Sequence, residues 1–248
     1  MTTQWPSPPG FGPVRPLDRV RHRGLGVKVG SYAFALTMPT VRLSLSEFFS
    51  ACRDYPIVFA RNATGQPLVP MVITGIKQNE NIFISRKGNW RKPYYVPAYV
   101  RSHPFCLVRL KRGKTADGQP SHQRIVCVDE EMLESNDRPY IDYRGKDTPA
   151  WNYINKLLME MEEMKPKGDR FIQALEEHKL LIEMHVGGGN ETHVQMFRVD
   201  ENRFHALTAE LTHQWLKSGY LRLIHAHLLS LDNFNRLAQL RHKWLEKS

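Results

Sequence analysis

The sequence predicts an α+β fold, in which an antiparallel β-rich N-terminal region is packed with a helical C-terminal region containing a β-hairpin. Three observations predict it. Between Ile57 and Val128, short β-branched and aromatic runs alternate with polar turn residues. From Pro149 onward, apolar residues recur at the three- and four-residue spacings of helices. Within that helical region, two strand-like runs flank Gly187–Gly189, a composition typical of a hairpin turn.

The chain has 248 residues, of which 41% are hydrophobic, enough to form a substantial core. Five of the first sixteen residues are prolines, which fix an extended backbone and remove hydrogen-bond donors. We therefore expect residues 1–30 to form a flexible, proline-rich basic extension without helix or strand. Residues 31–248 are expected to form a single composite domain, β-rich over 31–148 and mainly helical over 149–248.

In the β-rich part, Ser44 can cap a short apolar helix that ends before Pro56. The strands that follow are separated by polar turns, and the last two flank a loop rich in glycine and lysine. We expect these strands at residues 57–61, 68–76, 82–84, 106–110 and 124–128.

In the helical part, a helix from Pro149 to about Lys165 is expected to stop at Pro166–Gly168, and a second helix is expected at 170–179. The hairpin runs, 180–186 and 193–199, come next. Asp200 and Thr208 can cap two further helices. The last helix begins near Tyr220 and carries the strongest apolar stripe of the sequence, at Ile224, His227, Leu228, Leu231, Phe234 and Leu237.

Lys and Arg outnumber Asp and Glu by 35 to 25, a formal net charge of +10. The excess is concentrated in two places: residues 1–30, with five basic residues against one acid, and residues 101–115, with five and none. Residues 129–147 reverse the balance, with seven acids against three basic residues. Because there is no RNP-like strand, zinc finger or helix-turn-helix pattern, this patchy charge does not favour nucleic acid as a partner.

No apolar run approaches the roughly 20 residues of a membrane helix. The N-terminus shows no signal peptide, so a cytoplasmic location is the default expectation. Cys52, Cys106 and Cys127 lie far apart in the sequence, which favours buried thiols over a disulfide framework or a zinc site.

The segment Trp90–Phe105 holds five aromatic residues and three prolines. Tyrosine and tryptophan combine a large apolar surface with a polar group, so the segment can line a binding surface or plug one end of a sheet. A basic strip, Arg109–Lys114, follows. The candidate partner- or ligand-binding residues are Trp90, Tyr94, Tyr95, Tyr99, Arg101, His103, Arg109 and Lys111.

Catalytic and metal signatures are lacking. No G-x-S-x-G elbow, phosphate-binding loop or H-x-x-x-H helix with a glutamate is present, so we predict no catalytic residues and no cofactor. His185 and His193 flank the hairpin turn and are weak candidates for a metal pair, although surface histidines explain them as well. The acid pairs Glu130–Glu131 and Glu162–Glu163 are interpreted as solvated or capping charges.

Several motifs resemble the bacterial SapC family. They are Asp54–Phe59, the Gly88–Trp90 turn leading into Tyr95–Arg101, and Ser218–Leu231, and the resemblance extends over about residues 32–240. The family name is linked to a paracrystalline surface layer. It is shared with an unrelated peptide-transporter permease, which the missing membrane spans exclude. The resemblance implies a bacterial origin and supplies no catalytic residues.

Two hypotheses of function remain. The first is a non-enzymatic accessory or binding module that engages a protein or surface-layer-associated partner through an aromatic and basic surface. The alternative is an enzyme or metal-dependent module with an unrecognised pocket lined by the same aromatic residues and histidines. We expect a protein partner, and the sequence leaves the oligomeric state open.

Overall fold

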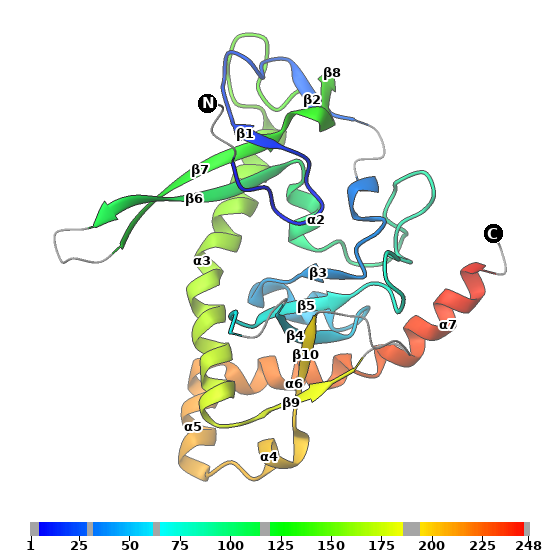
Figure 1. The fold of residues 1–248 in the computed structure, drawn as a ribbon, viewed down its shortest axis with the longest axis vertical. Coiled ribbons are helices and arrows are strands. Elements are labelled where there is room, and N and C mark those ends of the chain that lie inside the picture. The colour runs from blue at the N-terminus through cyan, green and yellow to red at the C-terminus, as the bar shows by residue number, and fades with distance from the viewer. Residues whose placement is uncertain (1–4, 29–31, 62–64, 115–119, 186–193, 246–248) are drawn as a thin grey trace. The chain divides into compact units, whose positions relative to one another are not determined.

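The computed structural model describes residues 5–28, 32–61, 65–114, 120–185 and 194–245 (Figure 1). It confirms the α+β class, because antiparallel sheets occupy the N-terminal region and helices dominate the C-terminal region. The chain forms two compact units. Unit 1 comprises Met1–Phe34, Arg86–Asn89 and Val100–Glu162, and unit 2 comprises Ala35–Ser85, Trp90–Tyr99 and Glu163–Ser248. The single composite domain of residues 31–248 stays a prediction.

Unit 1 contains two antiparallel sheets. The larger has the order β1-β7-β6 and consists of β1 (Val14–Pro16), β7 (Pro120–Asp129) and β6 (Phe105–Lys114). The smaller pairs β2 (Leu25–Val27) with β8 (Leu133–Ser135). One apolar cluster of this unit joins Phe105 and Val128 to Trp151, Ile154 and Leu158 of helix α3 (Pro149–Glu177).

Unit 2 is built on a five-stranded antiparallel sheet of order β3-β5-β4-β10-β9. Its strands are β3 (Thr40–Arg42), β4 (Ile57–Arg61), β5 (Val69–Ile73), β9 (Leu181–Met184) and β10 (Gln195–Val199). The predicted hairpin of β9 and β10 is confirmed, and β10 also pairs with β4, far away in the sequence. β4 is fully buried over Ile57–Ala60, as a central strand should be.

The remaining helices are short. They are α1 (Phe48–Ala51), α2 (Ala98–Ser102), α4 (Glu201–His205), α5 (Ala209–Ser218), α6 (Tyr220–Ser230) and α7 (Asn233–Leu245), with 3-10 turns at Ala33–Ala35, Leu45–Glu47 and Glu130–Met132. The predicted caps at Asp200 and Thr208 are confirmed, since Asp200 accepts from the backbone N–H groups of Asn202 and Arg203, and Thr208 accepts from that of Leu211. None of the helices among the described residues is both long and apolar enough to span a membrane.

The N-terminal segment differs from expectation. Within residues 5–28, Val14–Pro16 pairs with β7 and Leu25–Val27 pairs with β8, so the prediction that this segment forms no strand is wrong. Proline is tolerated here because β1 is an edge strand, and Pro16 lies opposite Cys127 at the outer edge of the sheet.

The predicted helix break at Pro166 is also wrong, because α3 is continuous from Pro149 to Glu177. Proline removes one helical hydrogen bond, but the helix buries apolar side chains on both sides of it. Leu157 and Leu158 are buried before Pro166, and Phe171 and Leu175 after it.

The last predicted helix is two helices, α6 and α7. Asn233 lies at the junction, 4% exposed, and its Nδ2 donates to the carbonyl oxygens of Cys52 (2.7 Å) and Tyr55 (3.2 Å). Ser230 accepts from the backbone N–H of Ile57 at 2.9 Å. These tertiary hydrogen bonds fix the junction, which helical periodicity does not reveal. Residues 82–84 likewise form no strand, although Ile84 makes an isolated bridge with Trp90.

Candidate functional site

Residues 90–99 of the aromatic segment are held by hydrogen bonds within unit 2. Glu47 is 5% exposed, and its Oε1 accepts from Tyr95 Oη at 2.9 Å and from the backbone N–H of Ala98 at 2.6 Å. Asp54 Oδ2 accepts from the backbone N–H of Tyr95 at 2.8 Å. Tyr55 donates its hydroxyl proton to the carbonyl oxygen of Tyr95. Two carboxylates and a tyrosine therefore fix the conformation of this segment.

This anchoring leaves few of the predicted aromatic residues available to a partner. Trp90 is 7% exposed, and its indole N–H donates to Tyr55 Oη at 3.2 Å. Tyr99 is also buried. Burial raises the pKa of Tyr55 well above its usual range, so this phenol stays protonated as a donor. Tyr94 and Tyr95 are half-buried, and the ring of Tyr94 lies beside a further aromatic surface.

That surface, here called the Trp244 patch, consists of Arg91, Lys92, Tyr94, Lys243 and Trp244. The Arg91 guanidinium lies over the indole of Trp244, 4.4 Å from the ring centroid. The Tyr94 and Trp244 rings meet edge to face with centroids 6.1 Å apart. Both rings also contact Phe83, which is fully buried and forms the base of the patch.

The charge of the patch is positive. Lys92 and Lys243 are exposed, while Arg91, Tyr94 and Trp244 are half-buried. Glu80 of the same unit is paired with Arg241, because both of its carboxylate oxygens lie 2.9 Å from Nε of Arg241. The patch therefore combines half-exposed aromatic rings with cations that have no acidic partner among the described residues.

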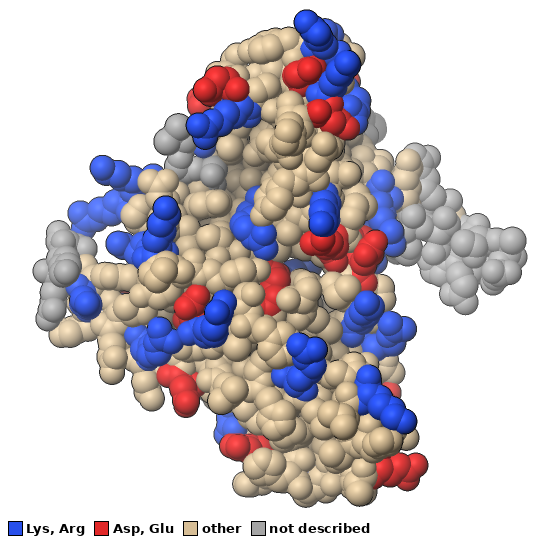
Figure 2. Space-filling view, turned by 180° about the vertical axis from the view of Figure 1, so that it is seen from behind, with Lys and Arg blue, Asp and Glu red and all other residues tan. Residues whose placement is uncertain are grey.

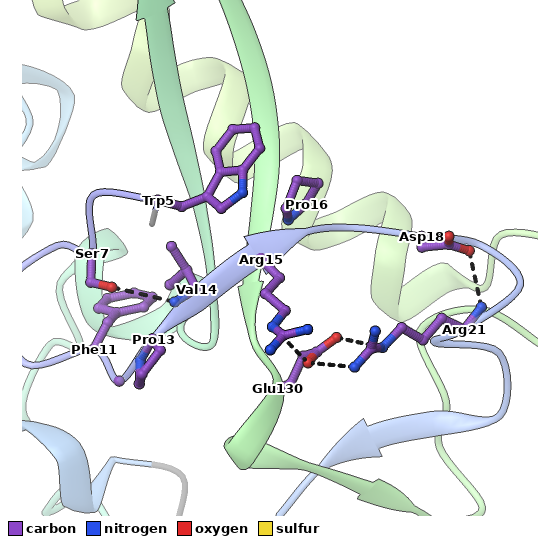
Figure 3. A pocket seen from close by; sticks show the side chains of 11 residues that line it. Trp5, Ser7, Phe11, Pro13, Val14, Arg15, Pro16, Asp18, Arg21 and Glu130 are labelled. Atoms are coloured by element: carbon purple, nitrogen blue, oxygen red, sulfur yellow. Dashed lines mark hydrogen bonds and ion pairs between the residues drawn. The ribbon is translucent and has the colours of Figure 1, made fainter. Parts of the chain in front are cut away.

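Unit 1 contains a pocket of about 830 Å³ built by the N-terminal segment (Figure 3). Trp5, Phe11, Val14 and the prolines form its apolar lining, and Arg15, Asp18, Arg21 and Glu130 contribute the charges. Arg21 forms a two-pronged contact with Glu130, through Nε at 2.8 Å and a terminal nitrogen at 3.0 Å. Arg15 reaches the same carboxylate more weakly, at 3.5 Å.

The charges of this pocket are balanced internally. His22, 3% exposed, accepts at Nδ1 from the backbone N–H of Asp18, so its Nε2–H donates to Glu130 at 2.9 Å. Asp18 accepts from the backbone N–H groups of Val20 and Arg21, and these hydrogen bonds hold its pKa below the usual range. The pocket therefore offers two guanidiniums and two carboxylates, a balance that selects neither anions nor cations.

The other predicted residues are dispersed. Arg101 donates to Tyr153 Oη at 2.6 Å, and His103 is 4% exposed and stacked on Phe34 with ring centroids 3.7 Å apart. Arg109 pairs with Glu162, and Lys111 belongs to β6, but its side chain lies outside the described residues.

The weak metal candidates are not brought together by any described geometry. His185 is exposed just after β9, and His193 lies outside the described residues. In the part of the chain that the structure describes, no group of three or more His, Cys, Asp or Glu side chains could hold a metal ion.

Sequence reasoning missed Arg91, Lys92, Lys243 and Trp244. Arg91 and Lys92 lie between the predicted residues Trp90 and Tyr94, but Trp244 is 150 positions away from Tyr94. Only the packing of α7 against Phe83 brings Trp244 to Tyr94. The available signal was Trp244 itself, an aromatic residue between a lysine and a leucine. This local pattern does not predict which residues Trp244 contacts.

Of the comparisons with known proteins, the one with protein-family models gives a match. No curated protein matches the chain, and no solved structure matches it either. The family model named SapC matches residues 17–237, which include β2, most of both units and the first residues of α7. The chain therefore belongs to the SapC family.

Proposed function

We propose that this SapC-family protein is a non-enzymatic binding protein that engages an acidic segment of a protein partner through the Trp244 patch. The observation that carries the proposal is the stacking of Arg91 on Trp244 at 4.4 Å, beside Tyr94 and two exposed lysines. Tryptophan, tyrosine and arginine are the residues most enriched among those that dominate binding energy at protein interfaces.

The rigidity of the patch supports the proposal. Phe83 supports both rings from below, and Arg91 Nε donates to the carbonyl oxygen of Ile82 at 3.2 Å, which orients the guanidinium over Trp244. A partner that binds a preformed surface loses less conformational entropy on binding. Within the part of the chain that the structure describes, no acid pairs with Arg91, Lys92 or Lys243, which favours carboxylate groups on the partner.

The family name suggests a surface-layer protein as the first partner to test. Among the described residues, no group of three or more His, Cys, Asp or Glu side chains supports the alternative of a metal-dependent module.

The test uses the full chain, immobilised and exposed to an extract of the bacterium from which it comes. Retained proteins are identified, purified and titrated against wild type, Arg91→Ala and Trp244→Ala. We expect each substitution to weaken binding by about tenfold or more, the effect of losing a dominant interface residue. We also expect the wild-type affinity to fall as salt is raised.

Arg222→Ala is the matched control, because Arg222 lies over the Phe49 ring at 4.3 Å and forms another arginine–aromatic pair in the same unit. Its substitution should leave binding unchanged. A partner that binds Arg91→Ala and Trp244→Ala as tightly as wild type contradicts the proposal, as does a partner without an acidic segment.

A further inference from the structure

Two of the three cysteines face each other across the β6–β7 ladder. Cys106 of β6 is the register partner of Cys127 of β7, and directly opposed residues of an antiparallel pair project from the same side of the sheet. Both belong to one apolar cluster with Val14 and Val108. Cys106 is 7% exposed and Cys127 is fully buried, and both are free thiols.

The backbone hydrogen bonds define the geometry of this pair. Val126 accepts from Leu17 N–H on the β1 side, and Asp129 N–H donates to Pro104 on the β6 side. Because backbone groups alternate in direction along a strand, those of Cys127 also face β6. Cys106 and Cys127 are therefore a hydrogen-bonded pair, with an expected Cα separation of about 5.5 Å, inside the range observed for disulfides.

The Cβ atoms of such a pair are about 5.5 Å apart, whereas a disulfide holds them at about 3.5–4.5 Å. A bridge at this position must pull the strands together by about 1 Å, so it forms under strain and is reduced more readily than an unstrained bridge.

We propose that Cys106 and Cys127 are a site of reversible oxidative modification, at which a cross-strand disulfide forms when the folding chain meets a small-molecule disulfide such as oxidised glutathione. The Cys106 thiolate attacks one glutathione sulfur and releases one glutathione. The Cys127 thiolate then attacks the Cys106 sulfur of the mixed disulfide and displaces the second glutathione. The two protein thiols give up two protons and two electrons, and one glutathione disulfide becomes two glutathione molecules.

The timing follows from burial. Trp5 and Phe11 of the N-terminal segment pack against the cluster that contains both cysteines. Burial raises the pKa of Cys106 to about 12 and that of Cys127 to about 11, so the folded chain presents protonated, covered thiols. The thiol–disulfide exchange therefore takes place during folding, before the N-terminal segment covers the two cysteines, or when that segment opens transiently.

The test refolds the reduced, denatured full chain in buffers that range from reduced to oxidised glutathione. Free thiols are then blocked, and the peptides are mapped by mass spectrometry without reduction. We expect wild type to give a peptide pair joined through Cys106 and Cys127, lighter by two hydrogens than the separate peptides, and lost when excess reduced glutathione is added. Cys52→Ala should give the same bridge. Cys127→Ala should give Cys106 carrying one glutathione.

The peptide map of wild type shows by itself whether the Cys106–Cys127 disulfide forms, even if a cysteine variant fails to fold. If wild type refolds with both thiols free in a buffer that attaches glutathione to Cys52, the proposal is overturned. Bridges that join Cys52 to either strand cysteine overturn it as well. Neither result depends on the binding of a partner at the Trp244 patch.

Discussion

His227 is a core histidine, as the apolar stripe of the last predicted helix suggested. It is fully buried, and its Nε2 accepts from the backbone N–H of Val199 at 3.0 Å, which ties α6 to β10. Burial lowers the pKa of His227 to about 4, helped by the nearby charge of Arg198 and partly opposed by the backbone of Ile57. The imidazole is therefore neutral in the folded protein at ordinary pH.

This pKa predicts a loss of stability in acid. An unfolded histidine binds a proton below about pH 6.5, whereas folded His227 stays neutral down to about pH 4. The stabilisation that depends on a neutral His227 is fully present above pH 6.5. As the pH falls from 6.5 toward 4, the free energy of unfolding should decrease by about 3 kcal/mol. Urea unfolding at a series of pH values measures it.

Substitution isolates the group responsible. A glutamine at position 227 can still accept from Val199 and does not titrate, so His227→Gln should flatten the free energy of unfolding between pH 6.5 and pH 4. His225→Gln is the control, because His225 lies on the exposed side of the same helix. Equal slopes in wild type and His227→Gln would show that other groups cause the acid dependence.

At the scale of elements, the β6–β7 hairpin places two arginines opposite each other, and a carboxylate of helix α3 neutralises their repulsion. Arg109 and Arg124 are directly opposed across the strands, an arrangement in which like charges repel. Glu162 of α3, with its side chain 10% exposed, has Oε1 at 2.5 Å from Arg109 and 2.9 Å from Arg124. The prediction that Glu162 is a solvated charge is therefore wrong, because one carboxylate serves two guanidiniums.

Glu162→Gln should destabilise the protein by about 1–2 kcal/mol, since it leaves two neighbouring guanidiniums without their counter-ion. Thermal unfolding measures the effect, and high salt should reduce it because both arginines are partly exposed. Glu163→Gln makes the same change at an exposed neighbouring position and should be silent. If Glu162→Gln is as stable as Glu163→Gln, the Glu162 carboxylate does not stabilise the protein by pairing with the two arginines.

At the scale of the whole molecule, the net charge of +10 is distributed differently from what the sequence suggests. Much of the basic N-terminal segment is paired with the acidic stretch of residues 129–147 in unit 1. Arg19 contacts Asp147 at 2.6 Å, and Arg21 contacts Glu130 at 2.8 Å. On the face shown in Figure 2, Lys and Arg side chains are scattered with acidic side chains among them.

These ion pairs predict how the N-terminal segment is held. Glu130→Gln removes the charge that Arg15, Arg21 and His22 share, so the segment should open more often and expose its backbone. Trypsin should then cleave after Arg19, Arg21 or Arg23 about tenfold faster, the effect of losing roughly 1.4 kcal/mol. Gel electrophoresis of timed digests measures it.

Glu134→Gln is the control for that experiment, because Glu134 is exposed in the same acidic stretch and no side-chain contact of it is described. Both variants lose one negative charge. If they are cleaved equally fast, net charge and not the local pairing at Glu130 determines how often the segment opens.

The α+β class, the hairpin of β9 and β10 and the caps at Asp200 and Thr208 follow from local patterns, and the sequence predicted them. The paired strands of residues 14–27 and the junction at Asn233 did not follow, because they rest on hydrogen bonds to residues more than 100 positions away. Of the candidate binding residues, only Tyr94 belongs to the patch on which the proposed function rests.

The sequence by itself determined the type of element at most positions and the membership of the SapC family, since propensity, periodicity and long motifs are local properties of the chain. Tertiary structure decided which side chains meet. Glu47 fixes Tyr95, Phe83 brings Tyr94 to Trp244, and register places Cys106 opposite Cys127. The physical reason is that burial and pairing depend on distances in space, which sequence separation does not encode.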